Sequence, residues 1–106
     1  MVMRITFDPE KSLKNLRERN LPFDCVIDFE WETTLTCRDE RRDYPEIRYI
    51  AIGYLSERLH VLCFTPIDSG IRVISFRRAN KREIKRYEKE IKKKYTTEVI
   101  TQAANQ

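Results

Sequence analysis

The chain has 106 residues and a formal net charge of +4, from 21 lysines and arginines against 17 aspartates and glutamates. This length suits one domain, and a hydrophobic fraction of 41% suits a globular fold. Two glycines and four prolines exclude a collagen-like or low-complexity chain. No apolar run reaches the roughly 18 residues of a membrane span. We therefore expect a small, soluble, basic domain without a membrane partner.

Cysteine and histidine limit the chemistry that is available. The three cysteines, Cys25, Cys37 and Cys63, form no close pair, so we expect neither a disulfide framework nor a zinc site. His60 is the only histidine, which excludes a mechanism that needs two. A nucleophilic pair of Cys63 with His60 is unfavourable, because residues three apart on a strand point to opposite faces. We expect reduced thiols, no metal or other cofactor, and a cytoplasmic protein.

The amino-terminal residues predict a strand followed by a helix. Residues 3–7 alternate in polarity and include β-branched side chains, which is typical of a strand. The pair Asp8-Pro9 supplies an N-cap and a proline at the first helical position, so a short helix should follow and end near Asn20. Leu13 and Leu16 are three residues apart and predict the apolar face of this helix.

The middle of the chain predicts a second short helix and then a series of strands. The helix begins at Pro22, although residues 25–29 are apolar and β-branched, so a strand competes there. A weak strand over residues 33–37 leads into a polar loop. Short reversals separate the later strands, and strands joined in this way are antiparallel neighbours. The stronger strands are expected at residues 46–53, 59–65 and 71–77.

The last helix is the clearest element. Asn80 can cap it, and Glu83 follows at the spacing of a capping box. Residues 96–106 lack helical periodicity and should form a flexible tail, so one domain should span residues 1–95. The overall prediction is an α+β fold, an antiparallel β-meander sheet with two short N-terminal helices and a basic C-terminal helix. The apolar stripe of the last helix consists of Ile84, Tyr87, Ile91 and Tyr95.

Positive charge gathers toward the carboxyl end. Residues 71–95 carry eleven lysines and arginines and three acidic residues, a net charge of +8, so the rest of the chain nets −4. Acidic residues gather instead over residues 24–32. This asymmetry suggests a polyanionic partner at the basic end, but a solvated lysine-rich helix explains the charge equally well.

Arginines interrupt the apolar strands of the meander. Burying an unpaired arginine is costly, so Arg48, Arg72 and Arg77 should each lie at a sheet edge, pair with an acid such as Glu46, or face a solvent-filled groove. A groove would gather guanidinium groups, which bind phosphate oxygens through paired hydrogen bonds. Such a cluster can stabilise the charge that develops when an RNA 2′-hydroxyl attacks the neighbouring phosphate. The candidates for proton transfer are Glu46, His60 and Tyr49.

An ordered set of short motifs runs through residues 5–88. They are Phe7-Asp8-Pro9-x-Lys11-x-x-x-Asn15-Leu16, Phe23-Asp24, Asp39-Glu40-Arg41, Tyr44-Pro45-Glu46-x-Arg48, Ile52-Gly53, the run from Ile71 to Ala79, Arg82-Glu83 and Tyr87-Glu88. Each piece is weak alone, but their order and spacing together are specific. The set resembles the BrnT family, the toxins of the BrnT–BrnA type II toxin–antitoxin systems.

The resemblance implies a RelE-like fold and a metal-independent endoribonuclease toxin that arrests growth by cutting RNA. It also implies a BrnA-like antitoxin with a ribbon-helix-helix part, through which the complex would reach operator DNA. By matching position, Arg77 and Arg78 are the best candidates for binding the phosphate and stabilising the transition state, followed by Arg48. The candidate RNA-binding residues are Arg72, Lys81, Arg82 and Arg19.

Two stretches depart from the family pattern. The family usually shows Lys-His-Gly after the Asn-Leu pair, where this chain has Glu18-Arg19-Asn20, and it often has an arginine where this chain has Pro66-Ile67. Arg17 and Arg19 should face away from position 18 on a helix. Two other functions therefore stay open: an attenuated or non-catalytic nucleic-acid-binding protein on the same fold, and an interaction domain whose basic helix docks an acidic partner.

Overall fold

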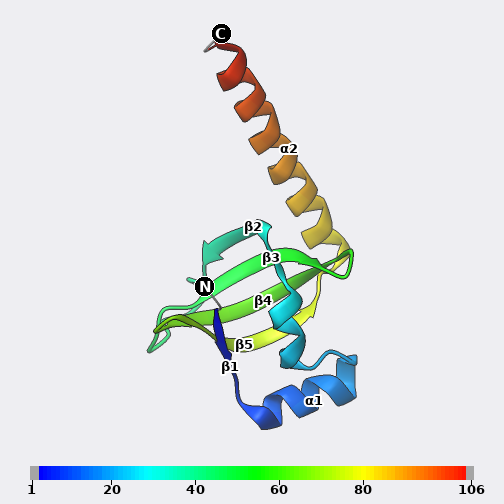
Figure 1. Ribbon diagram of the computed structural model, residues 1–106, viewed down its shortest axis with the longest axis vertical. Helices are drawn as coiled ribbons and strands as arrows, with labels where there is room; N and C mark the ends of the chain where they lie inside the picture. The colour runs from blue at the N-terminus through cyan, green and yellow to red at the C-terminus, as the bar shows by residue number, and fades with distance from the viewer. Residues whose placement is uncertain (1–2, 105–106) are drawn as a thin grey trace.

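A computed structural model describes residues 3–104, with the side chains of residues 3–94, and has an α+β fold with one five-stranded mixed sheet. Figure 1 shows this sheet at the centre of the molecule, with the two α-helices on opposite sides of it. The elements in chain order are β1 (Arg4–Thr6), α1 (Pro9–Arg19), the 3-10 helix η1 (Phe23–Asp28), β2 (Glu30–Arg38), β3 (Tyr49–Leu55), β4 (Arg58–Ile67), β5 (Gly70–Arg78) and α2 (Lys81–Ala104).

The sheet has the strand order β1-β5-β4-β3-β2. Strands β2 to β5 form the antiparallel meander that the short reversals predict. Strand β1 instead pairs in parallel with β5, with Ile5 opposite Ile71, so the sheet is mixed and the purely antiparallel prediction is wrong at this edge. Short reversals report only on strands that are adjacent in sequence, and they say nothing about where the first strand joins the sheet.

The hydrophobic core lies on the face of the sheet that η1 covers. Phe76, Leu62 and Val26 are its largest fully buried side chains, and each contributes about 1.5–3 kcal/mol by leaving water. Residues 23–28 form a 3-10 helix, and strand structure starts only at Glu30. Gly53 is required on this face, because a Cβ there would lie 2.7 Å from the Phe29 ring.

Helix α1 is attached to the rest of the molecule through polar side chains. Asp8 accepts a hydrogen bond from the Glu10 amide at 2.9 Å, as an N-cap should. The buried residues of α1 are Ser12 and Asn15, whereas the predicted apolar pair is exposed, Leu13 to 54% and Leu16 to 40%. The prediction of an apolar inner face is therefore wrong, because the inward residues bind backbone groups instead of packing.

Helix α2 starts with the predicted capping box. The backbone N–H of Asn80 donates to Glu83 Oε1, and the backbone N–H of Glu83 donates to Asn80 Oδ1, both at 2.9 Å. One turn later Tyr87 is buried, and its hydroxyl donates to the Thr33 carbonyl at 2.6 Å. These contacts hold the first turns of α2 against the sheet.

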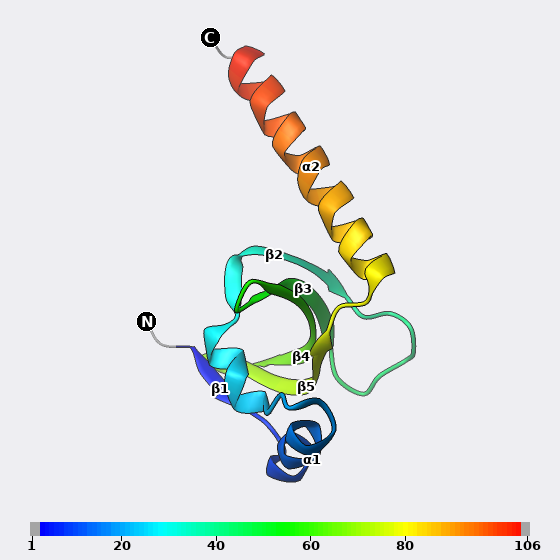
Figure 2. The ribbon, with the colours of Figure 1, turned by 90° about the vertical axis from the view of Figure 1, so that its right-hand side faces the viewer.

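The remainder of α2 projects away from the sheet (Figures 1 and 2). The helix continues to Ala104, so residues 96–104 are helical although they lack helical periodicity in the sequence. The flexibility of this segment and the domain boundary at residue 95 stay predictions. The side chain of Tyr95, the last residue of the predicted apolar stripe, lies outside the described part of the chain.

Candidate active site

Arginines from two separate elements meet where α1 ends beside strand β5. They surround a hollow of about 530 Å³, which we call the arginine hollow. Only one lining residue, Glu18, is acidic, and it also lies 4.0 Å from Lys14. The site is therefore strongly electropositive. The lining residues are Arg17, Glu18, Arg19, Asn20, Leu21, Arg77 and Arg78.

The end of α1 brings its last residues together on this hollow. Asn20 adopts the left-handed conformation, with φ of 54°, and ends the helix. Arg17, Glu18 and Arg19 all line the hollow, although helical spacing predicts that the two arginines face away from position 18. The prediction fails because long side chains on the last turn of a helix can reach a common space beyond its end.

Asn15 fixes the distance between the end of α1 and strand β5. Its Nδ2 donates to the Leu21 carbonyl at 2.7 Å and to the Phe76 carbonyl at 2.8 Å, and thus joins the end of α1 to β5. Its Oδ1 accepts a hydrogen bond from Arg19 Nη1 at 2.5 Å. One buried amide therefore sets the backbone on both sides of the hollow and orients one of its guanidinium groups.

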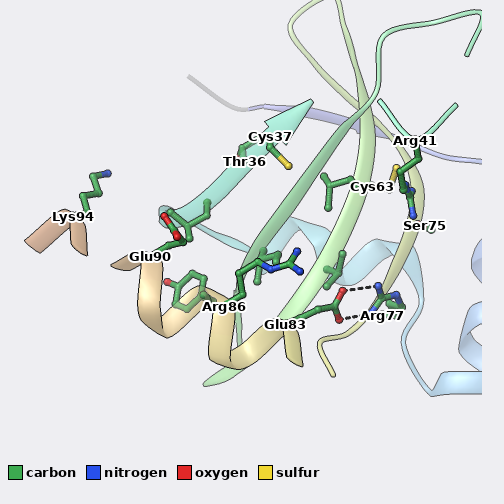
Figure 3. A pocket seen from close by; sticks show the side chains of 15 residues that line it. Thr36, Cys37, Arg41, Cys63, Ser75, Arg77, Glu83, Arg86, Glu90 and Lys94 are labelled. Atoms are coloured by element: carbon green, nitrogen blue, oxygen red, sulfur yellow. Dashed lines mark hydrogen bonds and ion pairs between the residues drawn. The ribbon is translucent and has the colours of Figure 1, made fainter. Parts of the chain in front are cut away.

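Arg77 is held by a carboxylate. Its two terminal nitrogens donate to the two oxygens of Glu83, at 2.8 and 2.9 Å (Figure 3). These hydrogen bonds raise the pKa of Arg77 and lower the pKa of Glu83. By contrast, Arg17 and Arg78 form no ion pair with any side chain among residues 3–94. Two of the four arginines that line the hollow thus remain available to an anion.

A second hollow of about 580 Å³ lies on the face of the sheet opposite the hydrophobic core, between the strands and α2 (Figure 3). We call it the sheet hollow. Arg77 lines both hollows, so they meet at this residue. The floor of the sheet hollow is apolar and includes Leu35, Ile50, Ile52 and Val61, and its charged rim consists of Arg41, Arg77, Glu83, Arg86, Glu90 and Lys94.

Arg41 reaches the sheet hollow from the loop after β2. Its Nε and Nη2 donate to the two oxygens of Asp39, each at 2.8 Å. Asp39 is buried, and these hydrogen bonds hold its pKa well below the usual value. The buried Cys63 lies beside the same carboxylate, with Sγ 3.9 Å from Asp39 Oδ2, and burial raises the pKa of this thiol. Asp39 thus orients the guanidinium over the sheet hollow.

Residues 7–83 match the family described as ribonuclease toxin, BrnT, of type II toxin-antitoxin system. The chain belongs to the BrnT family. Comparisons with curated proteins and with solved structures gave no match. The matched segment contains all seven residues of the arginine hollow, and most of α2 follows it.

The structure brings together only some of the residues that the BrnT resemblance points to. Arg19, Arg77 and Arg78 share the arginine hollow. Arg48 instead pairs with Glu46 in the loop before β3, and its guanidinium carbon lies 4.0 Å from the centre of the Tyr44 ring. The paired-acid alternative for this arginine is therefore confirmed, and Arg48 lines a different hollow, of about 360 Å³.

The remaining predicted RNA-binding residues lie outside the arginine hollow. Arg72 is exposed opposite Thr65 of β4. It lies six residues before Arg78 on β5, so the two Cα atoms are roughly 20 Å apart. Lys81 and Arg82 are exposed on the first turn of α2, close in sequence to Arg78.

The candidate acid and base groups lie in three different places. His60 is 4% exposed and pairs with Arg78 in the β4–β5 register, and its Nδ1 lies 2.8 Å from the Arg58 carbonyl. Burial is the main cause of its lowered pKa. Glu46 remains with Arg48 in the loop, and Tyr49 stacks on Phe64 beside the core.

Sequence reasoning set Arg17 aside, because helical spacing turns it away from position 18, and it gave no role to Arg41 of this BrnT chain. Arg41 belongs to one of the motifs that resemble the family. Asp39, two positions before it, was the sequence signal that a carboxylate could hold this guanidinium in place. Among the residues with described side chains, no three His, Cys, Asp or Glu lie close enough together to hold a metal ion. None of the helices in the described part of the chain combines the length and the hydropathy of a membrane span.

Proposed function

We propose that this member of the BrnT family is an endoribonuclease toxin and that its arginine hollow binds the scissile phosphate of RNA. The observation that carries the proposal is the convergence of four arginines on one hollow whose lining includes a single acidic residue. Two of these arginines have no ion-pair partner among the described side chains. Guanidinium matches phosphate geometry through paired hydrogen bonds, and the family is one of ribonuclease toxins.

The reaction uses a nucleophile that RNA itself supplies. The 2′-oxygen forms a bond to phosphorus as the bond from phosphorus to the 5′-oxygen breaks. The 2′-hydroxyl proton goes to a base and the leaving 5′-oxygen takes a proton from water, which leaves a 2′,3′-cyclic phosphate and a 5′-hydroxyl. Negative charge increases on the phosphoryl oxygens in the transition state. Arg77 and Arg78 stabilise that charge, and Arg17 and Arg19 hold the phosphate in place. The chemistry needs no metal ion, since the attacking and leaving oxygens both belong to the substrate.

We assign His60 as the candidate general base. A carbonyl oxygen only accepts hydrogen bonds, so the contact with Arg58 requires a proton on Nδ1 and leaves Nε2 able to accept the 2′-hydroxyl proton. The lowered pKa keeps the ring neutral near pH 7, as a base must be. His60 is also the register neighbour of Arg78. The roles assigned to Arg48 and Glu46 stay predictions.

The partner of this toxin follows from the family. We propose a BrnA-like ribbon-helix-helix antitoxin that neutralises the toxin and connects it to operator DNA, in the cytoplasm. We also propose that the mixed sheet with its two flanking α-helices is a RelE-like scaffold. Co-purification with the product of the neighbouring reading frame tests this partner.

The direct test compares growth and RNA cleavage for single variants of the hollow. Arg78→Ala keeps the ion pair between Arg77 and Glu83, so the fold should persist while the cleavage rate falls about 10²-fold or more. The double variant Lys11→Ala/Arg42→Ala removes two exposed cations elsewhere and should cleave like wild type. Wild-type products should end in 2′,3′-cyclic phosphate, with EDTA present or absent. Arg78→Ala toxin that arrests growth as well as wild type would refute the assignment.

A second function is favoured by two carboxylates near the arginines. Glu83 neutralises Arg77, and Glu18 adds a carboxylate to the hollow. Both reduce the positive charge at the scissile phosphate, as in an attenuated toxin or a non-catalytic RNA-binding protein. RNA that binds with a steep salt dependence and stays intact would support this function over cleavage.

A further inference from the structure

Helix α2 has two faces of different character. Its inner face contacts the sheet through Glu83 and Tyr87. Its outer face carries exposed lysines, which we call the lysine stripe. At 3.6 residues per turn, the four residues of the stripe fall within an arc of about 80°. They are Lys81, Lys85, Lys89 and Lys92.

Three of the four lysines of the stripe have no ion-pair partner among the described side chains. Arg82 and Lys93 flank the stripe on one side, and Glu88 is the acidic residue on the other. Lys81, Lys85 and Lys89 form no ion pair with any side chain among residues 3–94. Successive lysines four residues apart rise about 6 Å along the axis, and the stripe is about 17 Å long. It therefore presents a linear array of cations.

The composition of the stripe distinguishes among polyanionic partners. A protein interface requires an apolar centre, and a helix that lies on a membrane requires an apolar face. Between residues 81 and 94, the apolar side chains of α2, Ile84, Tyr87 and Ile91, are buried or half-buried on the inner side. Lysines without apolar neighbours are what sequence-independent binding to a nucleic-acid backbone needs.

The stripe is also continuous with the arginine hollow. Only Ala79 and Asn80 separate Arg78, which lines the hollow, from Lys81 at the start of the stripe. The capping box and the ion pair between Arg77 and Glu83 fix the direction in which α2 leaves the sheet. Figure 2 shows the helix leading away from the end of β5. An RNA strand bound in the hollow can therefore continue along the helix.

We propose that the lysine stripe of α2 binds the RNA backbone outside the cleavage site and so favours long RNA over short oligonucleotides. This inference rests on the proposed function, because it takes RNA as the ligand. The contacts are to phosphates and carry no sequence preference. The stripe contributes to affinity and leaves the chemical step unchanged.

The test is the salt dependence of binding to a 2′-O-methyl RNA of about 20 nucleotides, which cannot be cleaved by 2′-hydroxyl attack. In Lys85→Gln/Lys89→Gln, two phosphate contacts should be lost. Each contact contributes about 0.7 to the slope of log K against log salt for a single strand, so the slope should become shallower by about 1.4. Glutamine matches lysine in helix propensity, so the helix should persist. Lys11→Gln/Arg42→Gln removes the same charge from exposed positions outside the stripe and should keep the wild-type slope.

Cleavage separates this inference from the proposed function. Lys85→Gln/Lys89→Gln should raise KM for the long RNA several-fold with kcat unchanged, and it should cleave a short oligonucleotide like wild type. An unchanged slope and KM would overturn the lysine stripe while cleavage itself stands. Wild type that binds RNA through these lysines but never cuts it would overturn the proposed function and keep the stripe. If Lys85→Gln/Lys89→Gln lost the binding to phosphatidylserine vesicles that wild type shows but still bound RNA like wild type, the choice of RNA as the ligand would be overturned.

Discussion

Replacing Asn15 by alanine tests whether one buried amide holds the two sides of the arginine hollow together. The change removes hydrogen bonds of 2.7 and 2.8 Å and leaves the carbonyls of Leu21 and Phe76 without their donor. Each unsatisfied carbonyl costs about 1–3 kcal/mol. Alanine returns about 0.6 kcal/mol through its higher helix propensity. The free energy of unfolding should therefore fall by about 3 kcal/mol.

Urea denaturation measures this change directly. Trp31, the only tryptophan, lies edge-on to Phe29 and Phe64, so its fluorescence should report the loss of the core. The midpoint should fall without a change in the m-value. Lys11→Ala, an exposed substitution in the same helix, should stay within about 0.5 kcal/mol of wild type.

A second variant separates the hydrogen bonds from packing. Asn15→Asp keeps the size of the side chain but provides no N–H donors, and it places carboxylate oxygen against both carbonyls. It should destabilise the protein at pH 7 at least as much as alanine does. If the free energy of unfolding of Asn15→Ala lies within 1 kcal/mol of the wild-type value, water satisfies the two carbonyls and the amide does not hold the hollow together.

Two further substitutions address the sheet and the buried carboxylate. Gly70→Ala should lower the free energy of unfolding by about 1–3 kcal/mol, measured by thermal denaturation, because a Cβ there would overlap the Arg4 carbonyl of β1; a wild-type midpoint would contradict the close parallel pairing. Since Arg41 lowers the folded-state pKa of Asp39, the charged carboxylate stabilises the fold above its unfolded pKa of about 3.9, and this stability is lost as pH falls through the folded value. Asp39→Asn should therefore be less stable than wild type at pH 7, and this difference should shrink as the pH falls from 4 to 2 in urea denaturation; the same difference at pH 7 and pH 2 would refute the ionic role.

Elements set by local sequence were predictable. The capping box at Asn80 needs only residues that are adjacent on one turn, and the reversals of the meander need only neighbouring strands. The pairing of Arg48 with Glu46 is equally local, and sequence reasoning named that acid. The parallel pairing of β1 depends on a partner far along the chain, so no local pattern could indicate it.

The candidate site divides in the same way. Arg77 and Arg78 were found through the family motif, and both line the arginine hollow. Arg17 was considered and set aside, because helical spacing describes the middle of a helix, whereas the hollow lies beyond its end. The inward face of α1 was missed because Ser12 and Asn15 bind backbone groups of distant segments, which a hydrophobic pattern does not reveal.

The two halves of the arginine hollow are made at different times during translation. The bond from Asn15 to Phe76 joins residues 61 positions apart, and the contact of Thr6 with Ile71 joins residues 65 positions apart. The amino-terminal arginines must therefore wait until β5 has been synthesised before they gain their partners. A nascent or prematurely terminated chain carries Arg17 and Arg19 without the assembled surface, so the producing cell encounters that surface only when synthesis of the domain is nearly complete.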